Sequence, residues 1–254
     1  MNNRFQDKVV LVTGASEGIG RTTLLRFHEE GAKVINADKN ESAGKDIVAK
    51  IRANGGESMF VKTDVSQEIQ VKNLIKKIVD RFGRLDVAFN NAGIEEPNPG
   101  PIHTLESSDW QKVIDVNLKG VWLCMKYELE QYIEQGTGVI VNAASMCGLI
   151  SCLNVGSYVA SKHGVVGLTR TAAMDYAQKN IRINAVCPGC VHTGQVDRVT
   201  RGDPQELERL KQSQPIGRMG TTQEIASAVL FLCSAEASFI TGLAMAVDGG
   251  ATAQ

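Results

Sequence analysis

The chain has 254 residues and a formal net charge of −1, with 22% charged and 43% hydrophobic residues. Its length suits one α/β domain with its own core, and the balanced charge, without a basic stripe, argues against a nucleic-acid-binding protein. No apolar run reaches the roughly 18 residues of a membrane span, and the polar segment from Met1 to Lys8 lacks the apolar core of a signal peptide. We therefore expect one domain, 1–254, in a cytoplasmic protein that binds neither nucleic acid nor membrane.

Strand-like runs alternate with longer amphipathic segments along the chain. The runs are Lys8–Thr13, Lys33–Ala37, Glu57–Lys62, Leu85–Phe89, Gly138–Ala143, Ile181–Val186 and Ala244–Val247. Segments with helical periodicity lie near 18–30, 41–53, 67–82, 105–134, 155–179 and 222–234. This alternation predicts an α/β fold, a doubly wound parallel sheet of about seven strands with helices on both faces. Ligands bind beyond the carboxyl ends of the strands in such sheets, so the polar stretch 193–215 is expected to form a lid over a substrate.

A glycine-rich turn joins the first predicted strand to the first predicted helix and reads Thr13-Gly14-Ala15-Ser16-Glu17-Gly18-Ile19-Gly20. Gly14 permits a tight turn, Gly18 lets the backbone approach a pyrophosphate, and Gly20 lets the helix pack close to the sheet. The helix N-terminus offers free N–H groups to a phosphate. Because a strand precedes the turn and a helix follows it, a dinucleotide site is a better interpretation than a simple tight turn.

An acidic residue follows the second predicted strand at the position where a ribose-binding carboxylate is expected. Asp38 comes 18 positions after Gly20 (38 minus 20), close to the spacing typical of a residue that binds the ribose 2′-hydroxyl. It would repel a 2′-phosphate, as would Glu17, so both favour NAD over NADP. Lys39 is a contrary signal, which we interpret as a solvated side chain.

Two further residues, Asp64 and Val65, follow the third predicted strand. They could contact an adenine ring. Equally, they could belong to the N-cap region of the next helix, with Ser66 as the cap. The sequence leaves both interpretations open.

These motifs and several others together resemble the classical short-chain dehydrogenase/reductase family, over nearly the whole chain. The residues that carry the resemblance are, in order, Thr13 to Gly20, Asn90-Asn91-Ala92-Gly93, Asn117, Ser145, Tyr158-Val159-Ala160-Ser161-Lys162, Pro188-Gly189 with Thr193, and Val247-Asp248-Gly249-Gly250. Each motif is short, but their joint occurrence in this order is specific. The resemblance implies a Rossmann-like fold, a nicotinamide cofactor and a homotetramer.

The resemblance also implies a catalytic set of Asn117, Ser145, Tyr158 and Lys162. Tyr158 and Lys162 are four positions apart in a helical pattern, so they share one helix face. An ammonium group near a phenol favours the phenolate, and so would a positively charged nicotinamide ring. We expect Lys162 and that ring to lower the pKa of Tyr158 so that it acts as general acid and base. Ser145 would hold the substrate oxygen. Asn117 would organise its helix and a water that leads protons away through Lys162.

The resemblance assigns cofactor binding to 18 positions. They are Gly14, Ser16, Glu17, Gly18, Ile19, Gly20, Asp38, Asp64, Val65, Asn91, Ala92, Gly93, Tyr158, Lys162, Pro188, Gly189, Val191 and Thr193. The substrate would contact Ser145, Cys147, Tyr158 and Cys190, in a pocket lined by 146–153, Glu95 and Glu96. After Thr193 the chain reads Gly194-Gln195, where many relatives carry a proline and a bulky apolar residue, so the start of the lid departs from the family pattern.

The six cysteines are irregularly spaced, and we expect reduced, mostly buried thiols, as in a cytoplasmic protein. Cys187 and Cys190 form a C-x-x-C pattern. A redox motif of this kind opens a helix, whose dipole lowers a thiol pKa, whereas this one follows a strand. No second pair lies at the spacing of zinc ligands, so we expect no metal site.

The sequence therefore predicts an NAD(H)-dependent oxidoreductase that interconverts a small neutral secondary alcohol and its ketone. The neutral substrate follows from the apolar residues expected around the pocket, where no arginine pair for a carboxylate or phosphate is evident. The alternative enzyme is an NADPH-dependent 3-oxoacyl-carrier-protein reductase. The alternative without catalysis is a scaffold that senses the cofactor.

Overall fold

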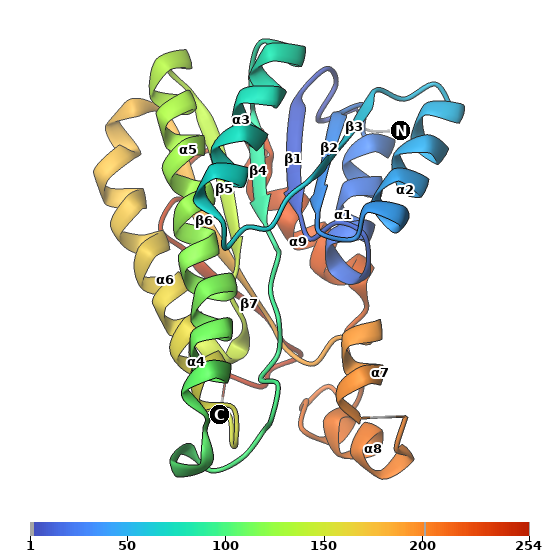
Figure 1. The fold of residues 1–254 in the computed structure, drawn as a ribbon, viewed down its shortest axis with the longest axis vertical. Coiled ribbons are helices and arrows are strands. Elements are labelled where there is room, and N and C mark those ends of the chain that lie inside the picture. The colour runs from blue at the N-terminus through green and yellow to red at the C-terminus, as the bar shows by residue number, and fades with distance from the viewer. Residues whose placement is uncertain (1–2, 201, 254) are drawn as a thin grey trace.

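The computed structural model describes residues 3–200 and 202–253. Its centre is a parallel sheet of seven strands in the order β3-β2-β1-β4-β5-β6-β7 (Figure 1). The strands are β1 (Val9–Thr13), β2 (Lys33–Asp38), β3 (Ser58–Lys62), β4 (Val87–Asn90), β5 (Gly138–Ala143), β6 (Ile181–Pro188) and β7 (Ala244–Val247). The predicted doubly wound, Rossmann-like α/β fold is confirmed.

Two apolar clusters, one on each face, hold the helices against the sheet. The first joins α3 (Glu68–Phe82), α5 (Gly120–Gln135) and α6 (Gly156–Tyr176) to one face. The second joins α1 (Gly18–Glu29), α2 (Glu41–Ala53) and α9 (Thr222–Cys233) to the other. In β1, the fully buried Leu11 belongs to the first cluster and its neighbours Val10 and Val12 to the second, which explains the continuous apolar runs of the sequence.

The strand order reverses direction between β1 and β4. These strands are neighbours in the sheet, with Val10 beside Val87 and Val12 beside Phe89. The helix that follows β1 covers one face and the helices that follow β4 cover the other. In open α/β sheets this arrangement opens a crevice at the carboxyl ends of the strands. The fold therefore brings the loops after β1, β2, β4 and β5 around one site.

Two predicted helical segments differ in detail from the structure. The segment 105–134 is α4 (Ser107–Val113), a π-helical turn (Ile114–Lys119) and then α5. The stretch 193–215, predicted as a weakly helical lid, contains α7 (Gly194–Thr200) and α8 (Pro204–Gln212). Asp203 caps α8 through a bond from Gln205 N to its carboxylate, 2.8 Å. Figure 1 shows α7 and α8 beyond the carboxyl ends of the strands.

None of the helices within 3–200 and 202–253 combines the length and the apolar character needed to cross a bilayer.

Candidate active site

The glycine-rich turn packs against the end of β4. Gly14 and Gly18 have left-handed φ angles of +64° and +57°. A Cβ on Gly14 would lie 2.8 Å from Ala92 Cα, and one on Gly20 would overlap the Gly14 carbonyl group. Gly14 and Gly20 therefore allow the tight turn and the close helix packing that the sequence predicts.

Asn91 links this turn to β4. Its side-chain amide donates to the carbonyl oxygens of Thr13 and Gly14, at 3.1 and 3.0 Å. The Thr13 hydroxyl in turn accepts from the backbone N–H groups of Asn91 and Ala92, at 3.0 and 3.1 Å. These bonds hold the ends of β1 and β4 at a fixed separation and form the floor of the crevice.

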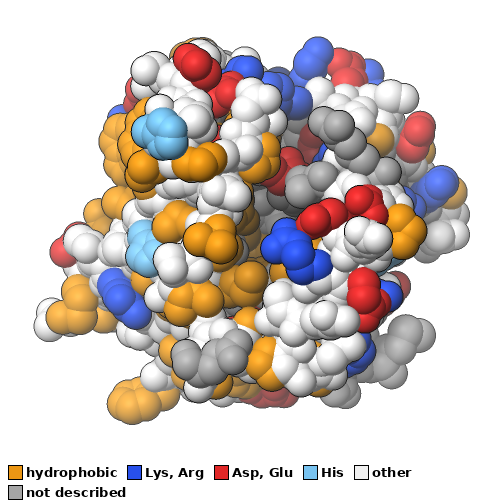
Figure 2. Space-filling view, turned by 90° about the horizontal axis from the view of Figure 1, so that it is seen from below, with side chains coloured by type: hydrophobic (Ala, Val, Ile, Leu, Met, Phe, Trp, Pro, Cys, Tyr) orange, Lys and Arg blue, Asp and Glu red, His pale blue; other side chains and the backbone are white. Residues whose placement is uncertain are grey.

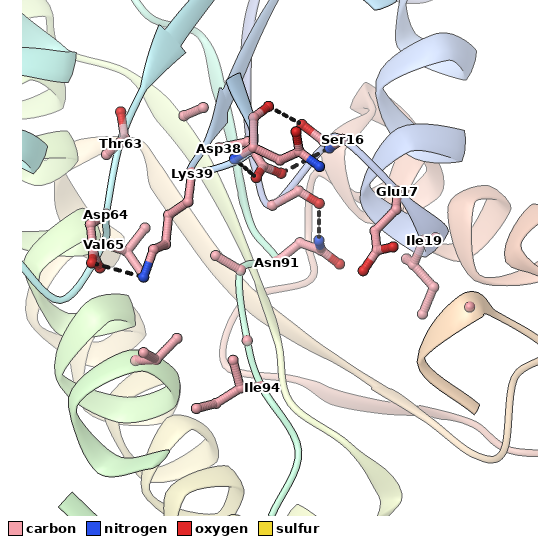
Figure 3. A pocket seen from close by; sticks show the side chains of 18 of the residues that line it. Ser16, Glu17, Ile19, Asp38, Lys39, Thr63, Asp64, Val65, Asn91 and Ile94 are labelled. Atoms are coloured by element: carbon pink, nitrogen blue, oxygen red, sulfur yellow. Dashed lines mark hydrogen bonds and ion pairs between the residues drawn. The ribbon is translucent and has the colours of Figure 1, made fainter. Parts of the chain in front are cut away.

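A cavity of about 440 Å³ opens above that floor (Figure 3). Twelve of the predicted cofactor residues line it: Gly14, Ser16, Glu17, Gly18, Ile19, Asp38, Asp64, Val65, Asn91, Ala92, Gly93 and Thr193. Six predicted positions are outside its lining: Gly20, Tyr158, Lys162, Pro188, Gly189 and Val191. The Val191 side chain lies in the core and is 5% exposed.

Asp38 is held at the cavity by the backbone. One carboxylate oxygen accepts from Ser16 N at 2.9 Å, and the other accepts from Asn40 N at 2.8 Å. These bonds leave lone pairs on both oxygens for a further donor, since each carboxylate oxygen accepts more than one bond. Asp38 thus keeps acceptor positions free at the cavity, where the sequence predicts a ribose.

Lys39 reaches across the cavity to Asp64, with Nζ 3.1 Å from Oδ2 (Figure 3). The lysine is exposed, as predicted, but its charge is paired with this carboxylate. Asp64 Oδ1 also accepts from the N–H and the hydroxyl of Ser66, at 3.0 and 2.7 Å. Ser66 is therefore not the cap of α3: the N-cap residue is Gln67, which makes no side-chain bond to the helix.

Glu17 lies at the rim of the cavity beside Arg198 of α7. The guanidinium contacts both carboxylate oxygens, at 2.7 and 3.1 Å. Arg198 also lines the cavity, and sequence reasoning missed it. No local pattern marks it, because its partner is 181 positions away.

Tyr158 and Lys162 lie one turn apart near the start of α6. Lys162 Nζ is 5.4 Å from the centre of the Tyr158 ring and donates to the Ala143 carbonyl at the end of β5, 2.9 Å. Burial lowers the pKa of Lys162 from 10.5 to about 8. Burial also raises the pKa of Tyr158 above its usual 10, although the Ser145 hydroxyl opposes the shift. In the protein chain alone, desolvation of the phenolate therefore outweighs the effects that lower its pKa. The predicted lowering also depends on a positively charged nicotinamide ring and stays a prediction.

Ser145 follows β5 and is nearly buried. Its hydroxyl accepts from Cys147 N at 3.1 Å and caps a short 3₁₀ turn, Met146–Gly148. Hydrogen bonding between the Ser145 and Tyr158 side chains opposes the rise in the Tyr158 pKa, so the two side chains are neighbours. The structure thus brings together this predicted pair from β5 and α6.

Asn117 lies in the π-helical turn between α4 and α5 and is fully buried. Its side-chain oxygen accepts from Ile94 N and its amide donates to Ile94 O, both at 2.8 Å. A Cβ on Gly93 would lie 3.3 Å from Asn117 Oδ1 and 3.6 Å from Lys162 Nζ. Asn117 and Lys162 therefore converge at Gly93, which lines the cavity.

The adjacent carboxylates expected in the substrate pocket have different environments. Burial raises the pKa of Glu95, and its Oε1 is buried with no hydrogen-bond partner among the described residues. Glu96 is 4% exposed and accepts from the Ser157 hydroxyl at 2.6 Å. The expectation that Glu96 lines the pocket is therefore wrong, since its carboxylate is engaged within the protein.

The cysteines also depart from expectation. Cys147 and Cys152 form a disulfide, with their Cα atoms 5.6 Å apart, so the prediction of six reduced thiols is wrong for these two. Cys187 and Cys190 are free, and burial raises the pKa of Cys187 to about 11, the opposite of a reactive thiol.

A second residue that sequence reasoning missed is Gln214, which lies near the end of the lid. It is 2% exposed, and its side-chain oxygen accepts from Cys190 N at 3.3 Å. A Cβ on Gly189 would collide with that oxygen. Gln214 therefore fixes the Pro188-Gly189-Cys190 turn, where the nicotinamide carboxamide is expected. A lone glutamine in a polar stretch gives no signal of this role.

Figure 2 looks onto the edge of the molecule that carries the lid. The surface is hollowed between its two halves. Hydrophobic side chains gather on one side of the hollow, and charged side chains are more frequent on the other. In the parts of the chain that the structure describes, no group of three or more His, Cys, Asp or Glu could hold a metal ion.

Comparisons with known proteins match the chain along its whole length. A family model described as "Enoyl-(Acyl carrier protein) reductase" matches residues 14–252. The cyclohexanol dehydrogenase of Acinetobacter sp. (strain SE19) is 42% identical, over 100% of this chain and 98% of the relative. The 2,5-dichloro-2,5-cyclohexadiene-1,4-diol dehydrogenase of Sphingobium indicum is 43% identical, over 97% of each. The crystal structure of levodione reductase aligns with a TM-score of 0.93 at 38% identity, over 98% of this chain and 99% of that one.

Proposed function

Because the chain belongs to the classical short-chain dehydrogenase/reductase family, we propose that it is an NAD(H)-dependent oxidoreductase that interconverts a secondary alcohol and a ketone. The observation that carries the proposal is the convergence of Asn117 and Lys162 at Gly93, on the wall of the cavity. Tyr158 lies beside Lys162 and Ser145 beside Tyr158. The site at this edge of the sheet thus combines a proton donor (Tyr158), a hydroxyl that can bind the substrate oxygen (Ser145) and a cavity for the cofactor.

The residues of the cavity fit a dinucleotide. Gly18 has a conformation that favours glycine and lies at the start of α1, where backbone N–H groups suit a pyrophosphate. Asp38 offers both carboxylate oxygens to a ribose diol. When bound, a nicotinamide cofactor supplies or accepts the hydride.

The negative charges support NAD rather than NADP. Asp38 and Glu17 both line the cavity. Asp38 would repel a 2′-phosphate, whereas the charge of Glu17 is partly neutralised by Arg198. Lys39 is paired with Asp64, so its charge is already partly neutralised. We infer that NADH is preferred over NADPH.

The proton chemistry follows from burial. Because the pKa of Tyr158 is raised, its hydroxyl stays protonated at neutral pH and can donate a proton to a ketone oxygen while the carbonyl carbon receives the hydride. The Ser145 hydroxyl would hold that oxygen. In the reverse direction Tyr158 must first lose its proton, so alcohol oxidation should speed up as the pH rises above neutrality.

The substrate we propose is a small ring alcohol or its ketone. The segment after Ser145 presents the partly buried side chains of Met146 and Leu149 beside Cys147, a mostly apolar surface. Relatives with over 40% identity are named for cyclohexanol and for a cyclohexadienediol. An apolar wall can pack against the carbon ring, and the Ser145 hydroxyl can bind its single oxygen.

We also propose a homotetramer. Large apolar side chains are exposed on α5 (Trp122, 46%), on α6 (Met174, 82%) and before β7 (Phe239, 103%). Exposed apolar groups on several faces favour assembly with further copies of the chain. Light scattering coupled to size exclusion should give about four times the chain mass, and a monomer at micromolar concentration would contradict the assembly.

The deciding experiment is a substrate screen with both cofactors. Cyclohexanol, its ketone and related ring alcohols are tested with NAD(H) and NADP(H), beside a 3-oxoacyl thioester. Tyr158→Phe should lose nearly all turnover and still bind NADH. A clear preference for NADPH with the thioester would favour the carrier-protein reductase, an activity related to the description of the matching family model. No turnover with any substrate would favour the cofactor-sensing scaffold.

A further inference from the structure

Helix α6 carries Tyr158 and Lys162, but its own sequence does not cap its N-terminus. Val155, at the N-cap position, makes no side-chain bond to the helix, and the first turn contains no acidic residue. The first N–H groups of a helix need acceptors from elsewhere when they are buried. Ser157, in this first turn, is fully buried, so its N–H group requires such a partner.

Glu96 provides the missing acceptor from the loop after β4. Its Oε2 accepts from Ser157 N at 3.1 Å and from the Ser157 hydroxyl at 2.6 Å. Both residues are buried, and bonds to a carboxylate are strong there. The carboxylate also lies at the positive end of the helix dipole. Glu96 therefore caps α6 at the residue directly before Tyr158.

The same short segment reaches a second member of the site. Ile94, two positions before Glu96, exchanges two hydrogen bonds of 2.8 Å with the Asn117 amide. The segment 94–96 thus ties the π-helical turn that holds Asn117 to the start of α6. Farther along the loop, Gly100 N donates to Asn154 O at 2.8 Å. This bond holds the loop against the segment directly before α6.

We propose that Glu96 is a positioning residue for proton transfer, which sets the place of the Tyr158 hydroxyl relative to Asn117 and Lys162 by capping α6 through Ser157. The inference rests on the proposed function. Proton transfer depends steeply on the distance between donor and acceptor, and a displacement of about 1 Å can cost roughly 100-fold in rate. A frayed first turn would allow such a displacement.

The test compares Glu96→Ala, Glu96→Gln and the control Glu106→Ala. Glu106 lies in the same loop, is exposed and makes no side-chain bond to α4. Glu96→Ala should lower kcat about 10- to 100-fold and raise the solvent deuterium isotope effect on kcat. The NADH dissociation constant should stay unchanged, since Glu96 does not line the cofactor cavity.

Glu96→Gln should recover most of the rate. Its amide oxygen can accept both bonds from Ser157, and its nitrogen would replace Oε1, which has no hydrogen-bond partner among the described residues. Ser157→Ala, which keeps the backbone bond, should give a smaller loss than Glu96→Ala, and the double variant should be no slower than Glu96→Ala alone.

Hydrogen exchange gives a readout that needs no turnover. Amides of 155–162 should exchange faster in Glu96→Ala than in the wild type, and Glu106→Ala should match the wild type there. Wild-type kcat and exchange in Glu96→Ala would overturn the inference. If Glu96→Ala does not fold, a wild-type kcat and isotope effect in Ser157→Ala would overturn it. A wild type without turnover would instead contradict the proposed function, and the exchange result would still decide the capping role.

Discussion

Arg198 of α7 and Glu17 of the glycine-rich turn form a two-point ion pair at 2.7 and 3.1 Å, across 181 positions of the chain. Both side chains are exposed, 57% and 64%, so the pair should add no more than about 1 kcal/mol to stability. It joins the lid to the rim of the cofactor cavity. The pair therefore matters for the position of the lid more than for the free energy of unfolding.

Arg198→Gln should accordingly loosen the lid. Limited proteolysis within 193–215 should be faster, and NADH should dissociate several-fold faster at low ionic strength, while the midpoint of thermal unfolding stays nearly constant. The matched control is Arg209→Gln in α8, since Arg209 pairs with Glu206 of its own helix at 2.9 Å. Salt at about 1 M should reduce the difference from the wild type, because it screens exposed charges. Unchanged proteolysis at low salt would show that the pair does not hold the lid.

Asp38 should determine the choice of cofactor. Asp38→Ala removes both acceptors for a ribose diol and a negative charge near a 2′-phosphate, so kcat/KM with NADH should fall about 10-fold or more and the ratio of NADH to NADPH activity should drop. Asp46→Ala, at an exposed position of α2, serves as the control and should change neither value. If the ratio of NADH to NADPH activity stays the same in Asp38→Ala, another residue binds the ribose and selects the cofactor.

Glu128 makes the stability of the protein depend on pH. It is buried in α5, where its Oε2 accepts from the Asn90 amide at 2.9 Å, and burial raises its pKa from 4.5 to about 8. Between these values the folded protein keeps a proton that the unfolded chain has lost. Its contribution to stability is therefore present below pH 4.5 and is lost as the pH rises toward 8, by up to about 1.4 kcal/mol per pH unit.

Glu128→Gln should remove that dependence, because the amide does not titrate and its oxygen can still accept from Asn90. Urea denaturation at pH 5, 6, 7 and 8 measures it: the wild type should lose stability more steeply than the variant. Glu134→Gln, exposed on the same helix, should behave like the wild type. Parallel curves for the wild type and Glu128→Gln would mean that Glu128 is ionised in the folded protein.

The Cys147–Cys152 disulfide closes a short loop directly after Ser145. Cross-linking a loop of this size stabilises a protein by about 2 kcal/mol in the chain-entropy model. Cys152→Ser should therefore lower the thermal midpoint by roughly 4–8 °C. It should also lower kcat modestly, since Cys147 N bonds the Ser145 hydroxyl.

Dithiothreitol provides the control for this prediction. It should lower the wild-type midpoint to that of Cys152→Ser and leave the variant unchanged. Thiol titration of the denatured, unreduced protein should find the four free cysteines, at 124, 187, 190 and 233. Six reactive thiols would show that the bond does not form.

Much of the architecture is predictable because it depends on local pattern. All seven predicted strands occur, and their bounds differ from prediction by two residues at most, since an apolar run between turns can be buried only in a sheet covered on both faces. Ser66, the cap of α3 in one of the two interpretations left open, does not cap the helix, because its hydroxyl bonds Asp64 instead. The π-helical turn at Asn117 was not predictable. A single turn with i to i+5 hydrogen bonds hardly changes the spacing of apolar residues along the helix, and that spacing is the signal from which a helix is predicted.

By itself, the sequence determined the glycine-rich turn, the acidic residue after β2 and the spacing of Tyr158 from Lys162, because each depends on residues close together in the chain. The tertiary structure decided which distant groups became partners. It placed Arg198 beside Glu17 and Glu96 in contact with Ser157. By partly burying Tyr158, it raised a pKa that the neighbouring lysine and a nicotinamide ring were expected to lower. Pairing and desolvation depend on the whole fold, since neither exists until remote segments pack together and exclude water.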